Sequence, residues 1–178
     1  MFKKFIPFAV AKNIYEIPIE FYKKLGIETL MMDLDNTLDS YKLYKPTEKA
    51  IKLIDDLKKN GITPIVVSNN KGKRVSSYAN ALNVDYINSA RKPFSFKLKK
   101  VIKIKNLNIE KLLFVGDQMI TDVLACRGAH VRMILTEKLV EEDQWTTHIN
   151  RIFGKRIRKY LKKRNKLRDW REIYGTCN

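Results

Sequence analysis

The segment ETLMMDLDNT, residues 28–37, places an apolar run directly before two aspartates that stand two positions apart. A short β-rich run that gives way to polar residues predicts a strand over residues 28–33. That strand would end at Asp33, and Asp35 would follow in the next loop. The segment therefore indicates a strand with acidic side chains at its carboxyl end.

Similar strand signals recur further along the chain, with helical stretches between them. The additional predicted strands are residues 62–68, 112–116 and 131–135, with a weaker candidate at residues 84–87. Helices are predicted for residues 46–59, 72–82, 95–104 and 121–127. This alternation is typical of βα units, so we expect an α/β fold with a three-layer, Rossmann-like parallel sheet.

The regions on either side of these units are predicted to be extensions of one domain. A chain of 178 residues is of ordinary size for a single core. We therefore predict a catalytic domain over residues 28–136 and a basic C-terminal extension over residues 137–178. Residues 1–27 form an N-terminal extension that packs on the core through apolar side chains, namely Ile14, Ile17, Ile19, Phe21 and Leu25.

The bulk composition excludes several classes of protein. With 44% hydrophobic residues and no repeat, the chain is neither disordered nor a solenoid. Two cysteines, Cys126 and Cys177, are too few and too far apart for a disulfide framework or a metal knuckle. No apolar run approaches the roughly 18 residues that span a bilayer. We expect a cytoplasmic protein that is neither exported nor membrane-spanning.

Polar residues stand at the ends of three predicted strands. Asp33 and Asp35 follow the first, Ser68 ends the second, and Asp117 and Asp122 follow the third. Each could be a helix cap or a turn residue. Because ligands gather at the carboxyl ends of parallel strands, the set also fits one site. A carboxylate nucleophile, an acid, Mg²⁺ and phosphate-binding donors are what phosphate monoester hydrolysis requires.

The order of these residues resembles the motifs of the haloacid dehalogenase (HAD) superfamily of phosphatases. The first motif, Asp-x-Asp-x-Thr, matches residues 33–37; a Ser after a strand matches Ser68; a lysine matches Lys92; and an acidic pair matches Asp117 and Asp122. For Lys92 alone, a solvated surface lysine is the plain alternative. The resemblance implies an HAD-like fold.

The same resemblance implies a role for each residue. Asp33 attacks phosphorus to form an aspartyl-phosphate, and Asp35 protonates the leaving oxygen and later activates water. Ser68, the backbone N–H of Asn69, and Lys92 hold the phosphoryl oxygens. Mg²⁺ is bound by Asp33, by the backbone carbonyl of Asp35, by Asp117 and, through water, by Asp122.

A narrower resemblance is to the YqeG-type phosphatases of HAD subclass IIIA and to the related mitochondrial phosphatidylglycerophosphatase. Its marks span residues 5–136 and include residues 14–17, 24–27, 33–38, 67–70, 74–75, 90–93, 115–118 and 121–123. After Val123 the sequence departs from the pattern, because an expected glycine pair and Asn-Arg are absent. The resemblance implies phosphatidylglycerophosphate as substrate. Residues 39–62 and 70–92 leave no room for a cap domain, so the site should be open.

The C-terminal extension carries most of the charge. Residues 151–171 include eleven Lys or Arg and one acid, hence +10 of the net +17. Apolar residues recur among them at helical spacing, which predicts a basic amphipathic helix. They are Ile149, Ile152, Phe153, Ile157, Tyr160, Leu161 and Leu167.

Such a helix has three possible roles. It could contact an anionic membrane peripherally through residues 149–171 at the inner face, each basic residue contributing about 1 kcal/mol. It could pack on the protein's own core, leaving the lysines merely solvated. It could also bind nucleic acid, to present a phosphorylated end to the site or as an RNA-binding module with a relic site. We favour the membrane, because no RNA-reading motif accompanies the helix.

Overall fold

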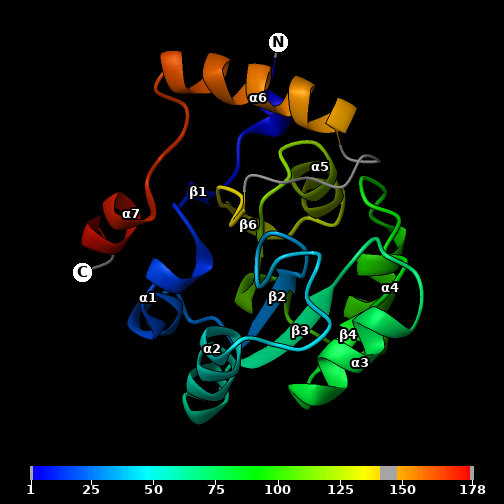
Figure 1. The fold of residues 1–178 in the computed structure, drawn as a ribbon. Coiled ribbons are helices and arrows are strands. Elements are labelled where there is room, and N and C mark those ends of the chain that lie inside the picture. The colour runs from blue at the N-terminus through cyan, green and yellow to red at the C-terminus, as the bar shows by residue number, and fades with distance from the viewer. Residues whose placement is uncertain (1, 141–147, 177–178) are drawn as a thin grey trace.

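The computed structural model describes residues 2–140 and 148–176, with the backbone alone for residues 148–151. Six strands form one parallel sheet in the order β1-β6-β5-β2-β3-β4 (Figure 1). They are β1 (Ala9–Val10), β2 (Thr29–Asp33), β3 (Thr63–Val67), β4 (Asp85–Ile87), β5 (Leu112–Gly116) and β6 (Arg132–Leu135). The expected parallel α/β sheet is thereby confirmed.

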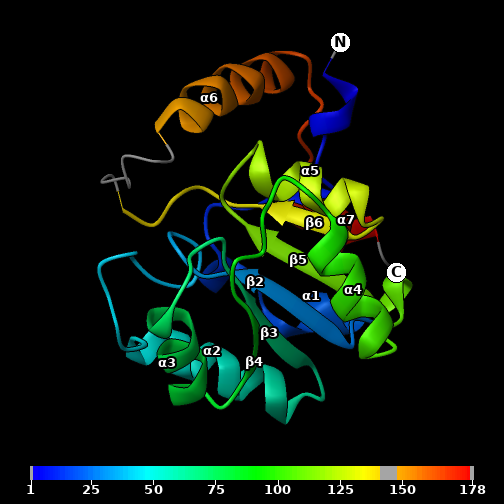
Figure 2. The same ribbon diagram turned by 90° about the vertical axis from the view of Figure 1, so that its right-hand side faces the viewer.

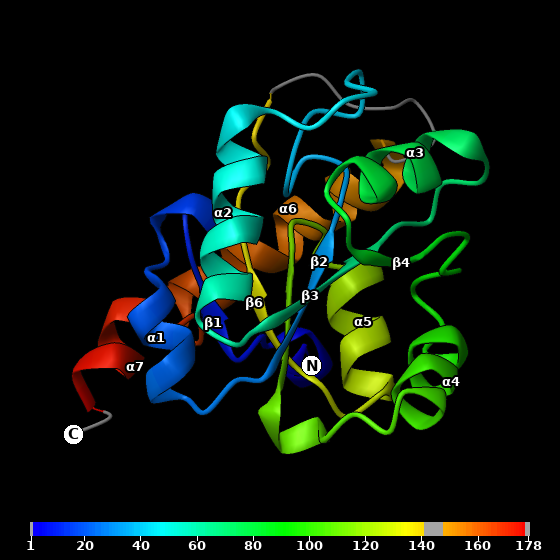
Figure 3. The ribbon, with the colours of Figure 1, turned by 90° about the horizontal axis from the view of Figure 1, so that it is seen from below.

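Helices cover both faces of the sheet. They are α1 (Ile19–Lys24), α2 (Glu48–Lys59), α3 (Lys73–Ala81), α4 (Phe96–Ile104), α5 (Thr121–Gly128), α6 (His148–Lys163) and α7 (Trp170–Thr176). Short 3₁₀ turns are found at Lys3–Phe5, Ile14–Glu16 and Ile109–Lys111. Figure 3 shows α1, α2 and α7 on one side of the sheet and α4 and α5 on the other. The fold is the three-layer arrangement predicted from the alternating strands and helices.

Strand alternation decides which side chains enter which layer. On β2, Leu30 and Met32 join the core beneath α1, α2 and α3, whereas Met31 joins the core beneath α4 and α5. Both faces of the strand are fully buried. A strand that is buried on both faces has a continuous run of apolar residues. Such a run at residues 28–33 is why the sequence predicted this strand.

Strand β1 was not predicted. It is two residues long and pairs with β6, Ala9 lying opposite Ile134 and Val10 opposite Leu135. The Val10 N–H also donates to the carbonyl of Arg168 at 2.8 Å, which ties the C-terminal segment to the N-terminal one. A two-residue strand is too short to show a period of two. The boundaries drawn at residues 27 and 136 stay a prediction.

Strand order determines which loops meet. Because β2 lies between β5 and β3, the residues that follow these three strands share one edge of the sheet. Strand β6 adjoins β5 and brings the segment after Leu135 to the same edge. This edge is where the parallel fold places ligands.

Helix α6 lies across α5 and beside the N-terminal segment (Figures 1 and 2). The predicted apolar stripe is divided. Ile157 and Leu161 are buried in the core that contains α5, whereas Ile152 and Phe153 are 43% and 53% exposed. Tyr160 is partly exposed and packs edge-on against Phe2, with ring centroids 5.2 Å apart. Part of the stripe therefore serves the protein's own core.

Two further points concern the predicted membrane contact. Leu167 is partly buried against the same core, and the side chain of Ile149 lies outside the described residues. Among the helices that the structure describes, none combines the length and apolar character needed to cross a bilayer.

Candidate active site

A buried ion cluster lies at the carboxyl ends of β2 and β5. The ammonium of Lys92 donates to Asp33 Oδ1 and lies 2.8 Å from Asp122 Oδ1. The side chains of these three residues are at most 4% exposed. Lys92 is thus not the solvated surface lysine that was its plain alternative. Burial alone would lower the pKa of Lys92, but Asp122 and Asp33 raise it above its ordinary value.

Three carboxylates of the site could hold a metal ion. One oxygen each of Asp33, Asp117 and Asp122 lies within 4.8 Å of the others, and all three residues are buried. Asp33 Oδ2 has no hydrogen-bond partner among the described residues. Burial raises the pKa of Asp33 well above its usual range, Lys92 opposes this, and Asp122 and Asp117 add to it. A hard divalent cation would balance this excess negative charge and accept the unpartnered oxygen as a ligand.

The carboxylate of Asp35 is not part of this group. Asp35 accepts hydrogen bonds from Arg74 Nη1 and Asn70 Nδ2, both at 2.7 Å, and from Ser68 Oγ at 3.3 Å. Arg74 also donates to the carbonyls of Leu43 and Ser40 at 3.0 and 3.3 Å. Arg74 therefore joins the predicted general acid to the loop of residues 40–43.

Sequence reasoning missed Arg74 and left Asn70 without a role. Both lie just after the predicted strand 62–68, Arg74 being in the first turn of α3. Position at a strand end was the available signal, but nothing local in the sequence shows that these side chains reach back to Asp35. That contact depends on the order of β2 and β3 in the sheet.

Ser68 and Asn69 are fixed by short-range and long-range contacts. Ser68 Oγ accepts the N–H of Asn70 at 3.1 Å, and the Ser68 side chain is buried. The Asn69 amide donates to the Lys92 carbonyl at 2.9 Å and accepts the Lys92 N–H at 2.8 Å. This reciprocal pair of hydrogen bonds holds the Lys92 backbone against the carboxyl end of β3, and from there the Lys92 side chain reaches Asp33.

Gly116 is required where Asp122 approaches the end of β5. A Cβ atom at Gly116 would lie 2.5 Å from Asp122 Oδ2. The same oxygen accepts the N–H of Gln118 at 3.0 Å. The absence of a side chain at Gly116 thus leaves room for the Asp122 carboxylate, whose Oδ1 lies 2.8 Å from the Lys92 ammonium.

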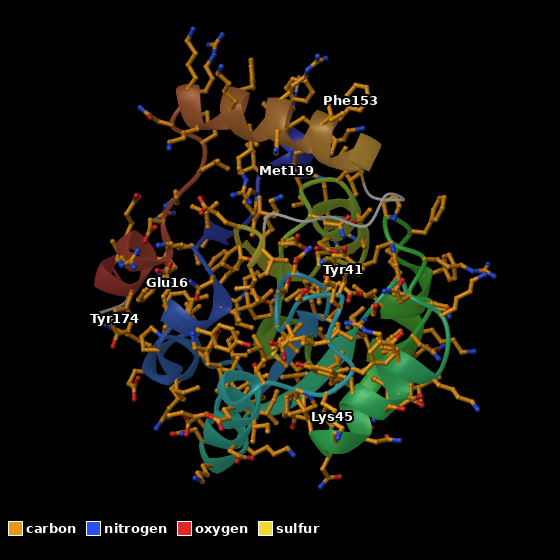
Figure 4. The ribbon with its side chains drawn as sticks, viewed as in Figure 1. Glu16, Tyr41, Lys45, Met119, Phe153 and Tyr174 are labelled. Atoms are coloured by element: carbon orange, nitrogen blue, oxygen red, sulfur yellow. The ribbon has the colours of Figure 1, made fainter. Side chains whose placement is uncertain are left out.

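The loop after Asp33 is held by a buried carboxylate. Asp39 accepts hydrogen bonds from the Tyr78 hydroxyl at 2.5 Å and from the N–H and Oγ1 of Thr47, both at 2.9 Å. The Asn36 N–H donates to the Asp39 carbonyl at 2.7 Å, which closes the turn after Asp35. Figure 4 shows Tyr41 in this loop, over the sheet edge.

Comparisons with known proteins find similarity in sequence and in fold. The family model described as haloacid dehalogenase-like hydrolase matches residues 2–136. The probable phosphatase YqeG of Bacillus subtilis (strain 168) is 32% identical over 173 residues, which cover 97% of this chain and all of that protein.

Two solved structures share the fold. The 3-deoxy-D-manno-octulosonate 8-phosphate phosphatase of Yersinia pestis has a TM-score of 0.51 at 12% identity and covers 89% of this chain and 95% of its own. A hypothetical protein of Xanthomonas campestris has a TM-score of 0.52 at 13% identity, covering 76% of this chain and 77% of its own. At these identities, the two structures support the fold alone.

Proposed function

The chain belongs to the haloacid dehalogenase-like hydrolases, and from this premise we propose that it hydrolyses phosphate monoesters through an aspartyl-phosphate formed on Asp33. The expected membership of the HAD superfamily and the similarity to a YqeG-type phosphatase are confirmed. Subclass IIIA and the likeness to phosphatidylglycerophosphatase stay proposals. The observation that carries the function is the buried Asp33 Oδ2, which has no hydrogen-bond partner among the described residues and lies within the cluster of Lys92, Asp117 and Asp122.

Each step assigns a task to a residue of the site. An oxygen of Asp33 attacks phosphorus, and the bond from phosphorus to the ester oxygen breaks. Asp35 gives a proton to that leaving oxygen and then takes one from the water that hydrolyses the aspartyl-phosphate. Arg74 and Asn70 each donate a 2.7 Å hydrogen bond to the Asp35 carboxylate, and these two bonds fix its orientation.

The same residues stabilise charge on the phosphoryl group. We propose that Ser68, the Asn69 N–H and Lys92 bind the phosphoryl oxygens, and that Asp33, the Asp35 carbonyl, Asp117 and Asp122 hold Mg²⁺. When bound, Mg²⁺ supplies positive charge that offsets repulsion between the carboxylates and the phosphate. Lys92 already lies between Asp33 and Asp122, so its ammonium can donate a hydrogen bond to a phosphoryl oxygen bound near Asp33.

The experiment that tests this function is Mg²⁺-dependent release of phosphate from an aryl phosphate. The change Asp33→Asn should lower the rate more than about a thousandfold, because it removes the attacking oxygen. Asp55→Asn, an exposed position on α2, is the matched control and should keep the rate. Undiminished turnover in Asp33→Asn with the circular dichroism spectrum intact would overturn the mechanism.

For the substrate we propose a phospholipid headgroup, with phosphatidylglycerophosphate as the leading candidate. The segments in which a cap domain would be inserted contain α2 and α3 of the fold itself, which supports an open site. Exposed Ile152 and Phe153 on the basic helix α6 support peripheral contact with an anionic membrane. A panel of phosphatidylglycerophosphate, sugar phosphates, nucleotides and phosphorylated oligonucleotides would identify the substrate.

The membrane contact has its own test, which is sedimentation with anionic and with neutral vesicles. Phe153→Ser and Ile152→Ser should weaken binding to anionic vesicles, whereas Ile51→Ser on α2 should not. Ile51 is a matched control because its side chain is 42% exposed, against 43% for Ile152. Equal binding by all variants, or preference for RNA at the same ionic strength, would contradict the membrane role.

A further inference from the structure

A cavity of about 290 Å³ opens beside the carboxylate cluster. Its walls come from the loop after β5, the segment after β6 and one side of α6; Figure 4 shows Met119, from the first of these walls, beneath α6. Asp117 lines this cavity and also belongs to the carboxylate group of Asp33. A ligand in the cavity would therefore lie next to the reacting phosphate. The volume suits a small group better than an acyl chain.

Thr136 lines this cavity, and its buried hydroxyl is unsatisfied among the described residues. It follows β6 directly, and its backbone is fixed because its N–H donates to Gly116 and its carbonyl accepts from Arg158 Nη2 at 2.5 Å. The residue is 1% exposed, and Thr136 Oγ1 has no hydrogen-bond partner among the described residues. Buried hydroxyls are ordinarily hydrogen-bonded, so a ligand atom in the cavity would account for this one.

Two cations of α6, Lys155 and Arg158, line the cavity together with Glu137 and Asp117. Asp117 is assigned to the metal in the proposed function, which leaves Glu137 as the one other acid among the described residues of this wall. Burial lowers the pKa of Arg158, and Glu137 and Asp117 offset that effect only in part. An anion in the cavity would add negative charge beside Arg158 and favour its charged form.

Helix α6 holds these cations in place. Ile157 and Leu161 anchor the helix in the core, and a Cβ atom at Gly154 would lie 3.2 Å from the Met119 Cβ. Arg158 is four positions beyond Gly154 and therefore lies on the side of α6 that faces the loop after β5. The part of the cavity wall that Arg158 forms is therefore preformed.

We propose that Thr136, Lys155 and Arg158 form an anion subsite for a second phosphoryl group of the substrate, beside the phosphate that Asp33 attacks. The inference rests on the proposed function and deepens it. The preferred substrates would be those with two phosphoryl groups, of which a headgroup with a phosphodiester and a terminal phosphate is one source. A small bisphosphate is the other source.

The test uses substrate pairs that share the phosphate to be hydrolysed. Glycerol 3-phosphate is compared with glycerophosphoglycerol phosphate, a deacylated headgroup, and fructose 6-phosphate with fructose 1,6-bisphosphate. The wild type should favour the doubly phosphorylated member in kcat/KM, and Thr136→Val and Arg158→Gln should each reduce that preference about tenfold, mainly through KM. Arg158→Lys should restore part of it. A preference limited to the headgroup pair would identify the lipid source.

Lys162→Gln is the matched control, because Lys162 is an exposed cation of α6 that does not line the cavity. It should keep the preference. Thr136→Val should keep the melting temperature, since it removes a hydroxyl that bonds to nothing described. An equal loss on both members of a pair, or no preference in the wild type, would overturn the subsite.

Calorimetric binding separates this inference from the proposed function. If the wild type hydrolyses neither member of the pair, the proposed function fails. Binding of glycerophosphoglycerol phosphate that Thr136→Val weakens would then still support the subsite. Absence of that binding would overturn the subsite as well.

Discussion

Lysine has opposite roles in two regions of this molecule. At the strand ends, the Lys92 side chain is 2% exposed and paired with Asp33 and Asp122. On α6, Lys159 and Lys162 are exposed to solvent. A buried cation is retained only where carboxylates compensate for lost hydration, whereas a solvated one contributes little to stability. The strand-end cluster therefore couples stability to chemistry, and the exposed cations of α6 leave the fold largely unaffected.

The largest expected effect comes from removing the buried lysine. Lys92→Met should lower activity more than about a thousandfold and, in EDTA, destabilise the protein by about 3–5 kcal/mol, because Asp33 and Asp122 lose their cation. Lys162→Met on α6 should change stability by less than about 0.5 kcal/mol. Urea unfolding with and without Mg²⁺ measures both. Equal stability of the two variants would remove the distinction between the regions.

Gly116, at the end of β5, lies where any side chain would collide with the site. Gly116→Ala places a methyl group 2.5 Å from Asp122 Oδ2, so the carboxylate must shift and the rate should fall about a hundredfold. Activity measured over a range of Mg²⁺ concentrations should also show that this variant binds Mg²⁺ more weakly than the wild type. Unchanged metal affinity and rate would mean that the position of Asp122 is not critical.

The pH dependence of the metal-free protein should come from the strand-end cluster. The pKa of Asp33 is raised in the folded state, mainly by burial, from an unfolded value of about 3.9. The folded state then binds more protons than the unfolded state, so stability falls as pH rises from about 4 through the raised pKa of Asp33. Asp33→Asn should remove this loss and be more stable than the wild type at pH 8 in EDTA. If the stability of the wild type and of Asp33→Asn changed in parallel with pH, the raised pKa of Asp33 would be contradicted.

The smallest effect is expected at the glycine of α6. Gly154→Ala meets the Met119 Cβ at 3.2 Å, so the flexible side chain must yield by a few tenths of an ångström. Alanine favours a helix interior by about 1 kcal/mol over glycine, which offsets that contact. Thermal unfolding should therefore change by less than about 1 kcal/mol. A large loss would mean that α6 is held more tightly than its half-exposed face suggests.

The sequence predicted the parts of the molecule that depend on local pattern. Apolar runs identified β2, β3, β4, β5 and β6, and the strand-end rule predicted that Asp33, Asp117 and Asp122 would meet, as they do. Lys92 was selected by its place in a family motif rather than by any local signal. Its burial became visible only in the structure.

Features that depend on tertiary placement were not predictable. The hydrogen bonds of Arg74 and Asn70 to Asp35 require β3 to lie beside β2. Thr136 follows a predicted strand, so the strand-end rule could have identified it, but its hydroxyl carries no charge to attract notice. The apolar stripe of α6 was recognised, yet its division between core and solvent depends on where the helix packs.

The most direct test of the central claim is to trap the phosphorylated protein. Rapid acid quenching during turnover of an aryl phosphate with Mg²⁺, followed by peptide mass spectrometry, should place a phosphoryl group on Asp33. Asp35→Asn should accumulate more of this species, because it cannot activate water to remove it. Turnover without any phosphorylated peptide in either protein, or phosphate on another residue, would contradict Asp33 as the nucleophile.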